Sequence, residues 1–350
     1  MSAGSAGPAF APWQQRIYTQ AGAALDAGRL GHGLLFCGPA QLGKRAVAER
    51  LAKRLLCQQR GGDGEPCGQC RSCRLFATRS QTDPVELRPD GRLAHPDGHP
   101  AHPDVELVGY AINDKARPPK PRSEIVIEQI RGLSERMALT PQFSDIRIAI
   151  IEPADAINNA AANALLKTLE EPVPGRYLWL ISAHPSRLPA TIRSRCQKLE
   201  FRLPPHAEAL AWLGERHDPA VAREALEAAR GHPGLADGWL RDDGLALRRQ
   251  VADDLAGLRR GQAAVPEVAQ RWTADERADL RLRFAADIAL AEAGDRLTDP
   301  LRTRSLAAWF DKANRVRELL RTTVRAELAV VELLMAWRAA DSRRAPGGAS

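Results

Sequence analysis

The stretch from Gly33 to Arg54 constrains the fold of this chain more than any other. The apolar residues 34–37 are long enough for a buried strand and too short for a helix. The next seven residues, GPAQLGK, have the spacing G-x-x-x-x-G-K, in which backbone N–H groups surround phosphates and the lysine neutralises them. Apolar residues at helical spacing follow. The sequence therefore predicts a phosphate-binding loop between a strand and the N-terminus of a helix.

The predicted loop departs from this motif at one position. The motif places Ser or Thr after the lysine, because that hydroxyl ligates the Mg²⁺ used in phosphoryl transfer. Here Arg45 follows Lys44. Its guanidinium cannot ligate a cation and adds a second positive charge. Gly38, Gly43 and Lys44 remain candidates for nucleotide binding, whereas metal-assisted hydrolysis is disfavoured.

A later strand carries a second departure. Residues 146–152, IRIAIIE, predict a buried strand that ends in a carboxylate. In P-loop proteins the corresponding strand ends in an Asp of the Mg²⁺ shell, usually followed by a Glu that activates water. This chain has Glu152 and then Pro153, which cannot act as a base. Together with Arg45, this favours weak or absent hydrolysis; the alternative is a divergent ATPase in which Glu152 holds Mg²⁺.

Four cysteines form a compact C-x9-C-x2-C-x2-C array: Cys57, Cys67, Cys70 and Cys73. Thiolates at this spacing can turn toward one point and complete the closed tetrahedral shell of a structural Zn²⁺. The alternatives are reduced thiols, a redox pair or a zinc-dependent nucleic-acid-binding module. The last should carry basic and aromatic residues, but the array contains arginines and no aromatic residue. We expect the isolated Cys37 and Cys196 to be buried small residues.

Length and composition set wider limits. With 350 residues, of which 44% are hydrophobic, the chain is expected to form two or three domains. The net charge of +7 suits a nucleic acid or an acidic protein partner, although the 5% aromatic content argues against base stacking. No apolar run approaches the ~20 residues that span a bilayer. No secretory signal is evident, so we expect a soluble cytoplasmic protein.

Residues 82–122 are dense in Pro, Asp, His and Gly. This composition predicts a long connection with little regular structure. His95, His99 and His102 could suggest metal binding. Because each is followed by Pro or flanked by Pro and Gly, we expect a mobile, solvated loop instead.

The remainder of the chain shows one further strand and then mainly helices. Residues 177–182 predict a buried strand, and the segment after it carries Arg193, Arg195 and Lys198, which form either a solvated edge or a group of charges offered to a phosphate. Pro204-Pro205 indicates a linker. Beyond it the sequence is helical, and residues 306–334 predict one long helix with a core-facing stripe.

Two runs, NALLKTLEEP at 163–172 and SRC at 194–196, together with the cysteine array, resemble bacterial clamp-loader subunits of the AAA+ superfamily. The resemblance covers most of residues 10–240. It implies an α/β RecA-like AAA+ P-loop domain with a zinc module over residues 1–202. A small helical lid domain over 203–244 and an all-α C-terminal collar domain over 245–350 would follow, and the collar would hold a five-membered ring together.

The resemblance also implies a function. Such complexes load the sliding clamp onto primed DNA for the replicative DNA polymerase, and their motor subunits hydrolyse ATP beside a rigid stator subunit. A motor subunit would carry Ser or Thr at Arg45, Asp-Glu at 152–153 and a lid arginine near 231–234. This chain is therefore similar to the stator, in which Arg195 would be the arginine finger for the ATP of a neighbouring motor subunit. A motor subunit with a divergent site remains the alternative.

Overall fold

The structure is a computed structural model and describes residues 9–83, 85–88, 93–113, 116–117, 120–295, 299–320 and 325–342. Contacts within the chain divide it into two compact units, Met1–Ala236 and Asp237–Ser350. The first unit contains the phosphate-binding loop and a parallel sheet, whereas the second is helical. A parallel α/β core followed by helices is therefore confirmed.

The first unit is built on a five-stranded sheet in the order β4-β7-β8-β1-β9, in which every pairing is parallel. The strands are β1 (Gly33–Cys37), β4 (Val105–Val108), β7 (Arg147–Ile151), β8 (Arg176–Ser182) and β9 (Gln197–Glu200). The strands predicted near residues 34–37, 146–152 and 177–182 are thus confirmed. Because the strands are parallel, their carboxyl ends all lie on the same side of the sheet. Ligands of such sheets bind at these carboxyl ends.

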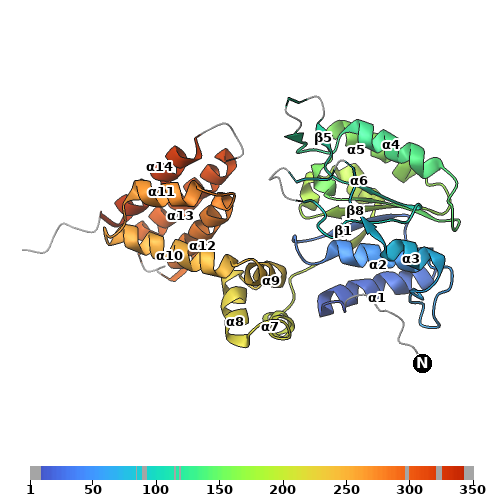
Figure 1. The fold of residues 1–350 in the computed structure, drawn as a ribbon, viewed down its shortest axis with the longest axis horizontal. Coiled ribbons are helices and arrows are strands. Elements are labelled where there is room, and N and C mark those ends of the chain that lie inside the picture. Colours follow the sequence, from blue (N-terminus) through green and yellow to red (C-terminus); the bar gives the residue numbers. More distant parts are fainter. Residues whose placement is uncertain are drawn as a thin grey trace, which may run out of the picture. The chain divides into compact units, whose positions relative to one another are not determined.

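Helices cover both faces of this sheet (Figure 1). Alternation along β1 sends Leu34 and Phe36 to one core and Leu35 and Cys37 to the other, so β1 is buried on both faces. The helices on the first face are α1 (Pro12–Asp26), α2 (Lys44–Leu56) and α3 (Arg71–Ala77); those on the second are α4 (Ile127–Ala138), α5 (Asn159–Glu170) and α6 (Ala190–Arg195).

The prediction of a mobile, solvated loop over residues 82–122 is wrong in the described part of this region. Its residues supply the edge strand β4 and the short strands β3 (His99–Pro100), β5 (Ile112–Asn113) and β6 (Lys120–Pro121), and β3 pairs with β2 (Arg79–Ser80). His95, His99 and His102 are only 8%, 6% and 2% exposed. Positions 84, 89–92, 114–115 and 118–119 lie outside the described residues.

His102 shows why this composition was misleading. Its Nε2 lies 2.9 Å from the Ser72 hydroxyl, which itself donates to the Leu56 carbonyl, and its Nδ1 accepts the Asp104 backbone N–H at 3.1 Å. Burial lowers the pKa of His102. A histidine with both nitrogens engaged can be buried at little cost, and a pattern of prolines cannot reveal such partners.

Helices make up the rest of the described chain. They are α7 (His206–Gly214), α8 (Pro219–Ala228), α9 (Pro233–Arg241), α10 (Gly244–Arg259), α11 (Val265–Thr273), α12 (Ala278–Asp295), α13 (Pro300–Leu319) and α14 (Ala326–Ser342). The single long helix predicted over 306–334 is wrong, because α13 ends at Leu319 and α14 begins at Ala326; residues 321–324 lie outside the description. Among the described residues, no helix is long and apolar enough to span a membrane.

Two glycines shape the phosphate-binding loop. Gly38 has φ 134°, and a Cβ there would lie 2.0 Å from the Phe201 carbonyl oxygen. Gly43 has φ 80°, and its missing Cβ makes room for Gln14 of α1. Gln14 Nε2 and the Trp13 indole N–H both donate to the Leu42 carbonyl, at 3.1 and 3.2 Å. The loop conformation therefore depends on glycine and on α1.

We expect Gly38→Ala to lower the free energy of unfolding by about 2 kcal/mol or more, because the new Cβ meets backbone that cannot move aside. Gly62→Ala is the matched control, since nothing lies within 4 Å of its added Cβ, and it should change stability by less than about 0.5 kcal/mol. Urea denaturation followed by circular dichroism measures both. Equal stability of the two variants would contradict the steric argument.

Candidate functional site

The predicted phosphate-binding loop lies where the sequence places it, between the end of β1 at Cys37 and the start of α2 at Lys44. Its lysine points back onto the loop: Lys44 Nζ donates to the carbonyls of Gly38 and Pro39 at 2.8 and 2.6 Å. Burial lowers the pKa of Lys44, and nearby Glu152 and Asp155 oppose this shift. To contact a phosphate, Lys44 would have to give up its hydrogen bonds to both carbonyls.

The loop is also covered at its tip. A Cβ at Gly234, in the first turn of α9, would lie 1.9 Å from the Gln41 carbonyl oxygen, so the two backbones touch. Gln41 itself has φ 59°. The structure thus brings together the predicted Gly38, Gly43 and Lys44, in a loop whose lysine is engaged and whose tip is in contact with a helix.

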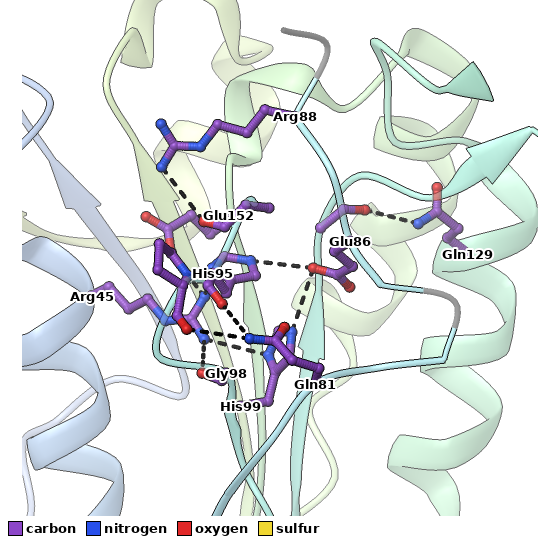
Figure 2. Close-up of polar contacts among 12 residues, drawn as sticks. Arg45, Gln81, Glu86, Arg88, His95, Gly98, His99, Gln129 and Glu152 are labelled. Carbon is purple, nitrogen blue, oxygen red and sulfur yellow. Dashed lines mark hydrogen bonds and ion pairs between the residues drawn. The ribbon is translucent and has the colours of Figure 1, made fainter. Parts of the chain in front are cut away.

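Arg45 contacts the other altered residue of the site. Its guanidinium Nη1 lies 3.4 Å from Glu152 Oε2 (Figure 2). Its Nε donates to Glu49 at 2.7 Å. Glu152 follows β7, at the same sheet edge as the loop. The residue that replaces the Mg²⁺-binding hydroxyl therefore pairs with the residue at the position of the Mg²⁺-shell carboxylate.

Two buried imidazoles and a carboxylate extend this network. His95 Nδ1 and His99 Nδ1 face Arg45, the latter at 3.3 Å from Nη2. On the far side, His95 Nε2 and His99 Nε2 lie 3.2 and 3.5 Å from Glu86 Oε2 (Figure 2). Burial raises the pKa of Glu86, but the contacts with His95 and then His99 outweigh it and lower the pKa to about 2. Sequence reasoning missed this cluster because it assigned the histidines to solvent.

Arg195 lies beside the amino end of β1, whereas the loop follows the carboxyl end of the same strand. It ends α6, and its carbonyl oxygen would be 3.3 Å from a Cβ at Gly33, the first residue of β1. The loop follows the other end of β1, and a strand of this length spans roughly 13 Å. Arg195 is therefore remote from the loop of its own chain.

The side chain of Arg195 joins the two runs that carry the clamp-loader resemblance. Its Nη2 pairs with Glu170 Oε1 at 2.6 Å, and its Nη1 donates to the Thr191 carbonyl at 2.9 Å. Arg195 belongs to the SRC run and Glu170 to the NALLKTLEEP run. The pair is partly exposed, at 36% and 48% of the two side chains, so it holds the guanidinium at the surface.

The structure gathers the four predicted cysteines into one cluster. The sulfurs of Cys57, Cys67, Cys70 and Cys73 all lie within 4.8 Å of one another, and none is in a disulfide. The Cys57–Cys70 sulfur distance is 4.0 Å, close to the ~3.8 Å edge of a tetrahedron with Zn–S bonds of about 2.3 Å. The donor set therefore fits a structural Zn²⁺.

Backbone amides support these sulfurs. The N–H groups of Cys67, Cys70 and Cys73 point to the sulfurs of Cys57, Cys67 and Cys70 at 3.3, 3.3 and 3.4 Å. Backbone N–H groups of Cys70 and Gln69 lower the pKa of Cys67 to about 6, which favours the thiolate that binds metal. Outside the cluster, Cys37 and Cys196 are buried, as predicted.

These features define a protein with a parallel α/β core in which a G-x-x-x-x-G-K loop joins a strand to a helix. Residues 13–205 match the family model described as DNA polymerase III, delta subunit. The chain belongs to this family, and the curated relatives that it matches include proteins named DNA polymerase III subunit delta'.

The relative from Pseudomonas aeruginosa, DNA polymerase III subunit delta', is 35% identical over 264 residues, which cover 75% of this chain and 70% of the relative. DNA polymerase III subunit gamma/tau of Mycobacterium tuberculosis is 31% identical over 229 residues, covering 63% and 34%. A solved structure of a gamma subunit-related protein from Thermotoga maritima has a TM-score of 0.50 at 15% identity, covering 93% of this chain and 99% of that one, and shows the fold alone.

We expect Cys70→Ser to reduce bound zinc by about one equivalent per chain and to lower the melting temperature, because a closed four-thiolate site contributes directly to folding. Metal analysis and a thermal melt of the purified variant test this. Cys196→Ala, which removes a buried thiol outside the cluster, should keep the zinc content of the natural chain. Equal zinc content in both variants would rule out the four-cysteine site.

Proposed function

We propose that this chain is a clamp-loader subunit of DNA polymerase III of the delta' type, a stator that does not hydrolyse ATP. The observation that carries the proposal is the contact between Arg45 and Glu152. Two positions that would share a Mg²⁺ in an active P-loop site are instead paired with each other as cation and carboxylate. The names of the curated relatives support the assignment to DNA polymerase III.

The pairing disfavours hydrolysis for an electrostatic reason. A Mg²⁺ at Glu152 would have to displace the guanidinium and then remain beside its positive charge, since Arg45 is also held by Glu49. Pro153 follows and supplies no base. The chain itself would therefore be no ATPase, although it would belong to the DNA-directed DNA polymerase holoenzyme. Nucleotide binding through Gly38, Gly43 and Lys44 is not needed for this role.

We propose further that Arg195 acts in trans as an arginine finger. It is remote from its own loop, exposed, and oriented by Glu170 and the Thr191 carbonyl. A guanidinium directed at the γ-phosphate of a neighbouring subunit would stabilise charge that develops in the transition state. Glu170 would be a positioning residue, because it acts on the reaction only through Arg195.

The complex that we propose is a cytoplasmic hetero-pentamer of this chain with motor subunits and delta, which acts on the sliding clamp and primed DNA. In it, residues 1–202 would form the AAA+ domain with its zinc module, 203–244 the lid and 245–350 the collar that joins the subunits. Structural Zn²⁺ at the four cysteines would be the resident metal. The distances between the four sulfurs, which fit a tetrahedral zinc shell, support Zn²⁺ as this metal.

Arg195→Ala should slow ATP hydrolysis at the neighbouring site that it faces by about 10³–10⁵-fold and abolish most clamp loading. DNA-stimulated ATPase and clamp loading of the reconstituted complex measure this. Lys198→Ala is the matched control, because Lys198 is an exposed cation three residues away on β9. If the assembled complex with Arg195→Ala hydrolysed ATP at an unchanged rate, the proposed role of Arg195 in trans would be wrong.

The purified chain should show negligible Mg²⁺-dependent ATPase, and Lys44→Ala should leave the ATPase of the complex unchanged. The persistence of Gly38, Gly43 and Lys44 favours the second candidate, a motor subunit with a divergent site. Hydrolysis by the purified chain that requires Mg²⁺ and disappears in Lys44→Ala would establish that candidate and exclude the stator.

A further inference from the structure

We propose that Glu86, His95 and His99 form a second metal site, which binds a divalent transition metal such as Zn²⁺ or Co²⁺ and is separate from the four-cysteine cluster. Two imidazole nitrogens and one carboxylate are donors that late first-row metals accept. The three ligand atoms lie within 4.8 Å of one another. The site does not depend on the proposed function, since it uses none of the residues assigned to that role.

The distances between the ligand atoms match a metal shell. With metal–ligand bonds of about 2.05 Å, the edge of a tetrahedron is about 3.35 Å. The observed separations of Glu86 Oε2 from His95 Nε2 and His99 Nε2 are 3.2 and 3.5 Å. Figure 2 shows both imidazoles directed at this oxygen.

Hydrogen bonds of normal geometry do not account for this convergence. Glu86 Oε2 lies at ion-pair distances from both imidazoles, but it and His99 Nε2 are buried and make no such hydrogen bond among the described residues. His99 is only 6% exposed, so bulk water does not supply the missing hydrogen bond. A buried imidazole nitrogen without a hydrogen bond is costly, and a cation bound between His99 Nε2 and Glu86 Oε2 would satisfy both atoms.

The backbone holds the three ligands in place before any metal binds. The Ala94 N–H donates to the Glu86 carbonyl at 2.9 Å, which sets His95 beside Glu86. The Gly98 N–H donates to the His95 carbonyl at 3.0 Å, and this turn brings round His99, which pairs with Ser80 in the β2–β3 ladder. Gly109 leaves the space at the end of β4, since a Cβ there would be 2.8 Å from Glu86 Oε2.

Metal binding would couple this site to the phosphate-binding loop. Coordination through Nε2 places a proton on Nδ1 of each imidazole, and both Nδ1 atoms face the Arg45 guanidinium, which is itself only a donor. The guanidinium would then withdraw toward its remaining acceptors, Glu49 and Glu152. The metal would thus strengthen the pairing that fills the altered cation site.

Titration of the metal-free, reduced full chain with Co²⁺ alone tests the site. We expect about two equivalents to remain bound after desalting: one with the thiolate-to-cobalt charge-transfer absorption of the cysteine cluster, and one without it. His99→Gln and Glu86→Gln should each lose the equivalent without thiolate absorption and keep the other, which also reports that the domain is folded. His184→Gln, an exposed histidine outside the cluster, should keep both.

Arg45→Gln retains all three ligands and should bind the second Co²⁺ about tenfold more tightly or better, because a repelling charge is removed. Two results would overturn the proposal. One is a natural chain that holds only the thiolate-bound equivalent. The other is a second equivalent that survives in His99→Gln, which would mean an adventitious ion only. An Arg45→Gln variant without tighter binding would overturn the coupling to the loop.

Discussion

The contact of Arg45 with Glu152 is the interaction on which the rest of the site depends. It places an internal cation at the sheet edge where a P-loop protein normally brings Mg²⁺ to a nucleotide. Arg45 is partly buried and follows Lys44 in sequence, and the carboxylates of Glu49 and Glu152 compensate its charge. The surrounding backbone then closes on the loop, through the Lys44 bonds to Gly38 and Pro39 and the contact of Gly234 with Gln41.

The loop and Arg195 lie at opposite ends of the strands of this sheet. The loop lies after the carboxyl end of β1, and Arg195 lies beside its amino end. The two ends of a strand lie apart, so a guanidinium beside the amino end of β1 does not reach the loop of its own chain. The Arg195–Glu170 pair keeps that guanidinium at the surface. The altered loop and the exposed arginine are thus separate features of one domain.

Peripheral elements around the sheet add two groups of side chains whose donor atoms could bind a metal. The cysteine cluster lies at the end of α2 and around α3, and Glu86, His95 and His99 lie against the loop through Arg45. The first is a set of thiolates held by backbone N–H groups, and the second a set of imidazoles and a carboxylate held by short strands and turns. Their different donor atoms make the two groups chemically distinguishable.

The sequence by itself determined the loop, the strands around residues 34–37, 146–152 and 177–182, and the cysteine cluster, because each depends on neighbours close along the chain: a glycine spacing, an apolar run or a C-x2-C pair. Tertiary structure alone decided the edge strand β4, the burial of His95, His99 and His102, and the separation of α13 from α14. The strand β4 and the buried histidines depend on partners distant in sequence. Arg45 meets His95 and His99 across 50 and 54 residues and Glu152 across 107, and no local pattern records such a meeting.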